Sequence, residues 1–333
     1  MPSSPFPFYL LNAFAPTLHS GNQAAVIFFD SASHPQSTDE QFMTLVARDF
    51  NFAETAYLVS LDGSRESKIG KYGLRWFTPE EEVALCGHAT LAASQAVFSI
   101  NPAFETIEFT TRFSGVLTAK KVEDKQVEIT LPSLPKNVLE AFDGKSSKED
   151  LTKVGSVFGV KEEEIVAVSP FVFGTRSSVI VSLSPQVDLS KIKASEADLV
   201  GQSFIGFALS HRSACILQLA FSDGMIIVTQ VAREQPDDQL HINSRVFAPG
   251  LGITEDPVTG SAHAYLTGYY VNSPLTTKLL PKKFAGSPLT TVLNGTQLSK
   301  RGGRLICIWD DGKVKLVGKA WEFGRGTLST PQA

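Results

Sequence analysis

Cysteine is scarce in this 333-residue chain, and the three present, Cys86, Cys215 and Cys307, stand far apart. Such spacing forms neither a disulfide framework nor a close set of metal ligands, which predicts a reduced, cytoplasmic protein without a metal site. Basic blocks are absent too, because 30 Lys and Arg residues face 34 Asp and Glu residues, for a formal net charge of -4. Proteins that bind nucleic acid carry a basic patch. We therefore expect no nucleic-acid partner and a small molecule instead.

Long apolar runs are also missing from the chain. None reaches the roughly 18 residues that a membrane-spanning helix needs. Residues 1–10 have neither a basic lead nor an uninterrupted apolar run, so they indicate an entering strand rather than a signal peptide. We expect no membrane partner.

Two distant stretches of the chain share one arrangement. A Phe-x-Pro tripeptide stands at 77–79 shortly before Gly87, and another stands at 247–249 shortly before Gly260. After each Gly the sequence becomes helical and is apolar on nearly every side. Such a helix has to be wrapped by other elements, so each would be the core of its own half. The pattern predicts two copies of one unit.

The remaining secondary structure follows from periodicity and turn residues. Capping-box spacing from Thr38 to Gln41 predicts a helix over 42–50, and a second helix is expected over 148–158. The acidic run 80–82 is interpreted as a solvated loop. Pro132 and Pro135 mark a boundary between an N-terminal lobe, 1–132, and a C-terminal lobe, 133–333. Strands are predicted at 8–14, 24–29, 52–58, 71–77, 107–111, 115–122, 127–131, 165–168, 178–182, 204–209, 216–221, 225–231, 305–309, 314–317 and 321–323.

Glu54 is the main candidate for an acid/base group. Strand alternation places it on one face with Phe52, Ala56 and Leu58. A carboxylate between apolar side chains loses water, which raises its pKa towards neutrality and lets it both accept and donate a proton. The alternative is a strand glutamate that faces water or pairs with Arg75 or Lys71, the more frequent situation for strand acids.

The two glycine turns are candidates for binding an anion. Backbone N–H groups at the helix starts of Gly87 and of Gly260 with Ser261 would face a substrate carboxylate. His88 opens the first helix, where the helix dipole lowers its pKa and keeps it neutral. Simpler readings exist for both turns: His88 as a core histidine bonded to backbone, and Asp256 with Ser261 as caps of an ordinary Asp-Pro turn.

Six blocks, in order along the chain, make the sequence similar to the phenazine-biosynthesis PhzF-like family, which has the diaminopimelate-epimerase-like fold. The resemblance implies an α+β protein of two pseudo-symmetric lobes, each a curved, mostly antiparallel sheet or barrel wrapped round a central apolar helix. It further implies that the last strand returns to the first lobe and that the protein is a homodimer. The blocks are Asn12-Ala13-Phe14 with 21–26, then 52–56, 75–79, 87–90, 244–249 and 255–262.

The resemblance also implies a function. Members of this family act without a cofactor, as isomerases that move a proton between carbon atoms of a small carboxylate-bearing substrate. Glu54 falls on the family's acid/base glutamate, and His88 and Asp256 would position the substrate or assist the proton. The groups that would hold the carboxylate are Gly87, Gly260 and Ser261.

Two other functions stay open from the residues. Amino-acid racemases and epimerases of this fold use two cysteines; Cys86 occupies the first position, but counting back from Gly260 places Pro257 at the second, which argues against a two-thiol mechanism. The other alternative is a non-catalytic protein that binds small carboxylates or acts as a scaffold. The residue before the glutamate, often Ser in the family, is Ala53 here, which leaves the phenazine precursor in doubt as substrate.

Overall fold

The computed structural model describes residues 6–61, 67–173, 176–194, 199, 203–204, 219–220, 224–275, 279–280, 284 and 292–329. These residues form a large mixed sheet with few helices, as the prediction of an α+β protein requires. Most of the strands predicted at 204–209 and 216–221, together with Cys215, lie outside the described residues. Of these segments the structure shows β11 (Ser203–Phe204) and β12 (Leu219–Ala220), which pair with each other.

In the first half of the chain, neighbouring strands pair in the order antiparallel, parallel, antiparallel, parallel, antiparallel, antiparallel. Helix α2 (Gly87–Ile100) lies between the parallel strands β4 and β6 in sequence, and the short β5 (Glu82–Val83) precedes it. The strands, in this order, are β1 (Phe6–Ala13), β2 (Asn22–Phe29), β3 (Glu54–Ser60), β4 (Ile69–Phe77), β6 (Thr106–Thr111), β7 (Val116–Val122) and β8 (Gln126–Pro132).

The second half repeats that order of pairings. Helix α6 (Gly260–Asn272) takes the place of α2, and β15 (Ile253–Asp256) takes the place of β5. The duplication that the sequence pattern predicts is therefore visible in the topology. The strands are β9 (Ile165–Phe173), β10 (Arg176–Leu183), β13 (Ile226–Val231), β14 (Leu240–Ala248), β16 (Val292–Gln297), β17 (Gly303–Asp310) and β18 (Lys313–Gly318).

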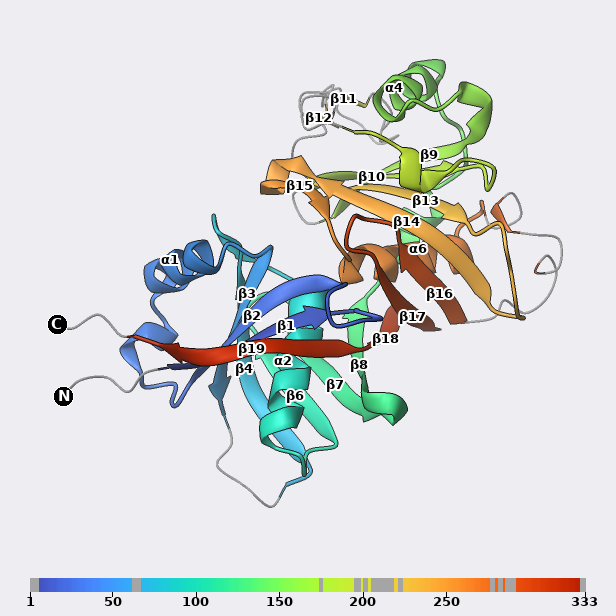
Figure 1. Ribbon diagram of the computed structural model, residues 1–333. Coiled ribbons are helices and arrows are strands. Elements are labelled where there is room, and N and C mark those ends of the chain that lie inside the picture. Colours follow the sequence, from blue (N-terminus) through green and yellow to red (C-terminus); the bar gives the residue numbers. More distant parts are fainter. Residues whose placement is uncertain are drawn as a thin grey trace.

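The two halves are joined through their strands. β18 pairs antiparallel with β8, the strand at the corresponding place in the first half. The chain then continues into β19 (Ala320–Leu328), which pairs antiparallel with β1, so the last strand lies beside the first (Figure 1). Because backbone hydrogen bonds cross between the halves, the junction between them is held in one register.

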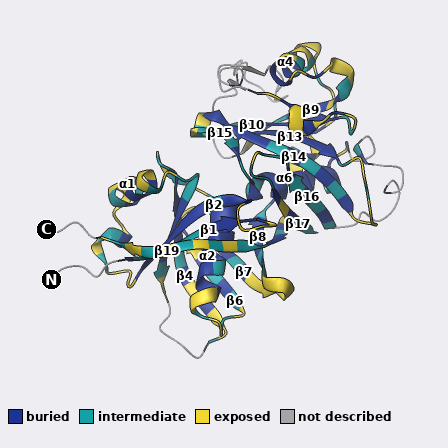
Figure 2. Cartoon of the chain, in the orientation of Figure 1, coloured by how far each residue is buried: buried dark blue, intermediate teal, exposed yellow. Residues whose placement is uncertain are grey.

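The two central helices are buried on almost every side. Eleven of the fourteen residues of α2 are buried, and ten of the thirteen of α6. Small residues such as Ala89, Ala92 and Ala93 allow the surrounding strands to approach α2 closely. Figure 2 shows this buried interior, with the exposed residues gathered on the outer helices and strand edges. A helical sequence that lacks a polar face therefore indicates a helix that is enclosed by strands.

The outer helices are amphipathic and capped. α1 (Glu40–Phe50) begins after Asp39, whose carboxylate accepts from the Phe42 N–H at 3.0 Å. The cap is therefore Asp39, one residue after the Thr38 at which the capping-box spacing begins, and the helix starts two residues before the predicted position 42. α4 (Lys148–Phe158) has the predicted bounds, with Ser147 as its cap. α3 (Lys136–Glu140) is short, and no helix within the described ranges has the length and apolarity for crossing a membrane.

Short 3-10 turns complete the fold: η1 (Pro35–Ser37), η2 (Glu123–Lys125), η3 (Glu162–Glu164), η4 (Leu189–Lys191) and η6 (Pro249–Leu251).

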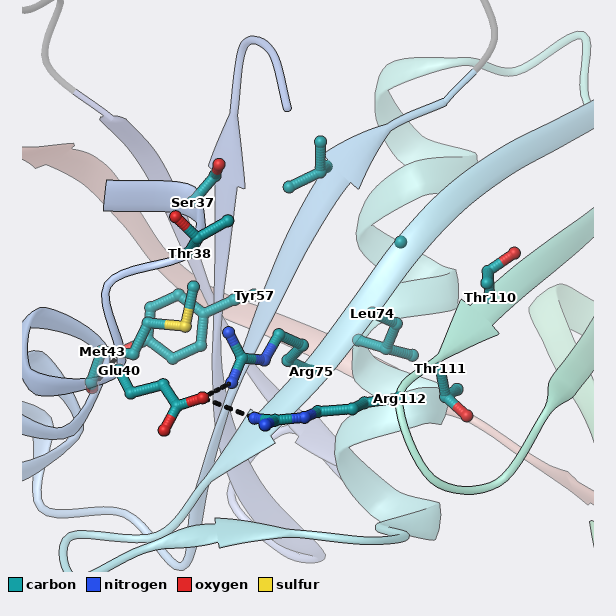
Figure 3. A pocket seen from close by; sticks show the side chains of 12 residues that line it. Ser37, Thr38, Glu40, Met43, Tyr57, Leu74, Arg75, Thr110, Thr111 and Arg112 are labelled. Carbon is teal, nitrogen blue, oxygen red and sulfur yellow. Dashed lines mark hydrogen bonds and ion pairs between the residues drawn. The ribbon is translucent and has the colours of Figure 1, made fainter. Parts of the chain in front are cut away.

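The acidic run at 80–82 is exposed at Glu80 and Glu81, as predicted for a solvated loop, but Glu82 departs from that prediction. The Glu82 side chain, only 10% exposed, accepts from Arg75 Nε at 2.7 Å and from Arg112 Nη1 at 2.8 Å. Figure 3 shows Glu40 reaching the same two arginines at the edge of a cavity of about 420 Å³. Each arginine thus faces two carboxylates, and the residues that line this cavity include none of the predicted site residues.

Replacing Glu82 with Gln should lower the free energy of unfolding by about 2 kcal/mol, because hydrogen bonds to charged groups are lost while Arg75 stays half-buried. The matched control is Glu80→Gln, two residues away and 74% exposed in its side chain, which should change stability by less than about 0.5 kcal/mol. Urea unfolding of both variants measures the difference. Equal effects would contradict a structural role for Glu82.

Candidate active site

The N-termini of the two central helices meet at the junction of the halves. A Cβ atom built on Gly87 would lie 3.0 Å from the Gly260 Cα, and one built on Gly260 would lie 3.1 Å from the Gly87 Cα. Glycine is therefore what permits this close approach. The cap residues Cys86 and Thr259 make no side-chain capping hydrogen bond. Because the first N–H groups of a helix have no partner within it, two positive helix ends point at one place, which favours an anion there.

Glu54 is the first residue of β3 and lies beside this junction. Ala56 and Leu58, on the same face of the strand, belong to the core that surrounds α2. The Glu54 side chain is only 13% exposed. Burial raises the pKa of its carboxyl to about 8, the carboxylate of Asp256 adds to the rise, and hydrogen bonding with Cys86 opposes it. The alternative of a glutamate paired with Arg75 is wrong, because Arg75 binds Glu82 and Glu40.

His88, the second residue of α2, faces Glu54. Its Nε2 lies 3.1 Å from Glu54 Oε2, yet the two atoms are not aligned as a hydrogen bond, and neither has another hydrogen-bond partner among the described residues. Buried polar atoms are rarely left in this state unless a further group binds them. Burial lowers the pKa of His88, although the Asp256 carboxylate and the Gln23 backbone oppose this. The ring is therefore neutral at neutral pH.

Asp256, at the end of β15, is held from several sides. It is buried, its Oδ1 accepts from Asn22 Nδ2 at 2.7 Å, and its Oδ2 accepts from the Thr259 hydroxyl. Gln297 fixes the same loop, since its amide donates to the Asp256 backbone oxygen at 2.6 Å and accepts from the Thr259 N–H at 2.9 Å. The protein's own contacts thus hold the Asp256 carboxylate in one orientation.

Ser261 is the second residue of α6, the place that His88 occupies in α2, and it is half-buried next to Gly260. The structure therefore brings all six predicted residues to one junction. Three come from the first half and three from the second: Glu54, Gly87, His88, Asp256, Gly260 and Ser261.

Two further residues at this junction carry no sequence signal that points to the site. Asn22 is 1% exposed and contacts both His88 and Asp256. Its sequence context, Gly21-Asn22, is typical of a turn, and an exposed turn asparagine looks the same in sequence. Gln297 ends β16, a strand that was not predicted because Asn294 and Gly295 interrupt its apolar pattern. Buried amides of this kind carry no periodic signal.

Cys86 and Thr259 occupy equivalent places, as the residues that precede α2 and α6. The prediction that Pro257 stands opposite Cys86 is therefore wrong by two residues; Thr259 does, and its hydroxyl donates to Asp256. Burial and the Glu54 carboxylate raise the pKa of Cys86 well above its ordinary value. A thiol that stays protonated opposite a threonine does not supply the two thiol bases of the racemases.

Glu54, Cys86 and His88 each have an atom that could bind a metal ion, and these atoms lie within 4.8 Å of one another. Cys86 Sγ, however, lies 3.5 Å from His88 Nδ1, whereas Glu54 lies against Nε2. The two nitrogens of an imidazole point in different directions. One ion bound to either nitrogen would leave the group at the other nitrogen out of place, so these three residues do not fit a single metal.

Repeated sheets surround two buried helices, whose starts converge on a carboxylate and a histidine. This is the architecture of a PhzF-like class of protein. Within this class, the chain belongs to the phenazine biosynthesis-like protein family, whose model matches residues 11–321.

Relatives and solved structures agree with this membership. A phenazine biosynthesis-like domain-containing protein of Bos taurus is 32% identical over 97% of this chain and 99% of its own. An uncharacterized isomerase of Pseudomonas aeruginosa is 28% identical over 96% and 97%. The crystal structure of a PhzF-family phenazine biosynthesis protein from Enterococcus faecalis superposes with a TM-score of 0.68 at 29% identity, covering 97% and 99%. A hydroxyproline epimerase from Agrobacterium vitis, at 11% identity, a TM-score of 0.56 and coverage of 99% and 95%, shares the fold.

Proposed function

We propose that this protein is a cofactor-independent isomerase that moves a proton between carbon atoms of a small carboxylate-bearing substrate. One observation carries the proposal: a buried glutamate with a pKa raised to about 8 lies in contact with a neutral histidine. The helix starts of Gly87 and Gly260 meet at the same junction. Two bacterial relatives, 28% and 29% identical, bear the name uncharacterized isomerase, which supports the same class of reaction.

In the proposed reaction Glu54, once ionised, takes a proton from a carbon of the substrate. The electron pair left by the C–H bond moves through the adjacent double bond, and negative charge develops on the substrate carboxylate as an enolate. The backbone N–H groups that follow Gly87 and Gly260 face this charge, and such preorganised donors stabilise a transition state strongly. Glu54, whose carboxyl proton exchanges with solvent, then returns a proton to another carbon, so none is gained or lost overall.

His88 and Asp256 support the proton transfer in different ways. A neutral His88 can donate from its ring N–H to the Glu54 carboxylate or to the substrate without adding a second acid to the site. Asp256, by its negative charge, raises the pKa of Glu54. A base with a pKa near the working pH is the most effective general catalyst.

Solvent deuterium incorporation tests the proposal against both alternatives. A panel of unsaturated carboxylic acids and amino acids is incubated with the protein in deuterated water and followed by NMR. The proposal expects deuterium at two carbons of one unsaturated acid, together with a shifted double bond. Exchange confined to the α-carbon of an amino acid would mean a racemase, and binding of a carboxylate without exchange would mean a non-catalytic protein; either result contradicts the proposal.

Replacing Cys86 with Ala should leave turnover on the substrate so identified within about threefold of the native rate, because the protonated thiol is not the base. Removal of a true acid/base group costs about 100-fold or more. The measurement is the initial rate of deuterium incorporation, with Cys307→Ala, another buried cysteine, as the control. A 100-fold loss in Cys86→Ala alone would restore a thiol mechanism.

A further inference from the structure

Asn22 connects the two halves of the site through a single amide group. Its Nδ2 lies 2.7 Å from Asp256 Oδ1 and 3.0 Å from the Val258 backbone oxygen, both from the second half. The same nitrogen lies 3.1 Å from His88 Nδ1, in the first half. Because a carboxylate and a carbonyl can only accept hydrogen bonds, the amide nitrogen and not its oxygen must occupy this position. The two hydrogens of this amide therefore face two fixed acceptors, Asp256 Oδ1 and the Val258 oxygen, and the ring nitrogen His88 Nδ1.

This arrangement decides where His88 carries its proton. His88 Nδ1 faces the Asn22 amide and, at 3.5 Å, the Cys86 sulfur. A proton on Nδ1 would point at an N–H group, so Nδ1 is the acceptor of the neutral ring and the proton resides on Nε2. Nε2 is the nitrogen that lies 3.1 Å from the Glu54 carboxylate. The other titratable groups that face the ring are Cys86 and Asp256.

The backbone around Asn22 is fixed by contacts from the second half. Gly21, at a positive φ of 77°, has no room for a Cβ, which would lie 2.4 Å from the Ala13 oxygen. Arg301 Nε donates to the Gly21 oxygen at 2.8 Å, and the Gly21 N–H donates to the Gly302 oxygen at 2.7 Å. The amide is thereby delivered to the junction with little freedom to turn away.

We propose that Asn22 is a positioning residue that keeps the His88 proton on Nε2, towards Glu54, and that it links this tautomer to the placement of Asp256 across the two halves. An ionised Asp256 binds one amide hydrogen firmly, because charge-assisted hydrogen bonds are the stronger ones. The second hydrogen is then divided between the Val258 oxygen and His88 Nδ1. The catalytic part of this inference rests on the proposed function, whereas the tautomer does not.

The test is NMR of protein labelled with ¹⁵N-histidine, in which the His88 signals are assigned by their loss in His88→Gln. Long-range proton–nitrogen correlations distinguish the two neutral tautomers from the charged ring. The native protein should show the Nε2–H form of His88 at neutral pH, because burial lowers the pKa of its ring. Asn22→Ala should give a mixture of tautomers or the Nδ1–H form. On an identified substrate it should lower turnover about 100-fold with little change in KM.

The matched control is Asn12→Ala. Asn12 is also a buried asparagine, on the neighbouring strand β1, but its amide binds the Leu18 oxygen and Arg301 rather than the site. Its loss should leave the His88 spectrum unchanged. Should Asn22→Ala fail to fold, Asn22→Leu keeps the volume of the side chain and removes its donor, and it should likewise release the His88 proton from Nε2. An unaltered Nε2–H signal in the Asn22 variants, or an equal change in Asn12→Ala, would overturn the proposal.

Discussion

Glu54→Gln is expected to abolish proton transfer to and from carbon while the protein stays folded. Glutamine keeps the shape of the side chain but cannot accept the proton, so turnover should fall at least about 100-fold. In the native enzyme, the ionised form of Glu54 is the base, and its pKa is raised to about 8. The native kcat/KM should therefore rise with pH up to about 8, and the variant should lack this rise. Rates of deuterium incorporation across pH measure both.

The same substitution has a predictable effect on stability. A carboxyl whose pKa is raised from 4.5 to about 8 on folding holds its proton more tightly in the folded state. The stability that this tighter proton binding gives to the folded protein is fully present below the pKa of the unfolded state. It is lost as the pH rises through the pKa of the folded state. Native stability should decline across this window, and Glu54→Gln should remove that part of the decline. Glu105→Gln is the control, because the Glu105 side chain is 62% exposed. This variant should show the same decline of stability with pH as the native protein. An active or unfolded Glu54→Gln would contradict the assignment.

Gly260→Ala is expected to have the second large effect. The added Cβ would lie 3.1 Å from the Gly87 Cα, which is backbone and cannot rotate away. The two helix starts would have to separate, which should cost about 1–3 kcal/mol of stability as overpacking does. It should also displace the N–H groups that face the substrate carboxylate, for a loss of about 100-fold in turnover.

Gly73→Ala is the control for this change, since the nearest atom to its added Cβ would lie 3.9 Å away. Gly73→Ala should have nearly the native stability in urea unfolding and nearly the native rate of deuterium incorporation. If Gly260→Ala turned over at the native rate, the meeting of the two helix starts would not be the substrate cradle.

Much of the fold follows from local sequence patterns. Strand alternation and helical periodicity identify most strands and both α1 and α4, because those elements each bury one face. The absence of a polar face identifies α2 and α6 as enclosed helices. Four strands are not predicted: β5, β14, β15 and β16. β16 contains Asn294 and Gly295, and β5 and β15 are only two and four residues long.

The candidate site is predictable only where a residue has a local signature. Glu54 stands out because it interrupts an apolar strand face, and Gly87 and Gly260 because each opens a helix. The catalytic role of Glu54 follows from the family resemblance, since the strand pattern alone favours a structural or solvated glutamate. Asn22 acquires its importance from Asp256, 234 residues away in sequence, a contact that no local pattern reports. Glu82 is similar: its neighbours in sequence suggest a solvated loop, but Arg75 and Arg112 reach it from other strands.

The titration of the Glu54 carboxyl by ¹³C NMR, identified by its absence in Glu54→Gln, tests the central claim most directly. The account predicts a carboxyl signal that changes its ionisation near pH 8, in a folded protein without substrate. A titration below about pH 5, as for an ordinary glutamate, would contradict it.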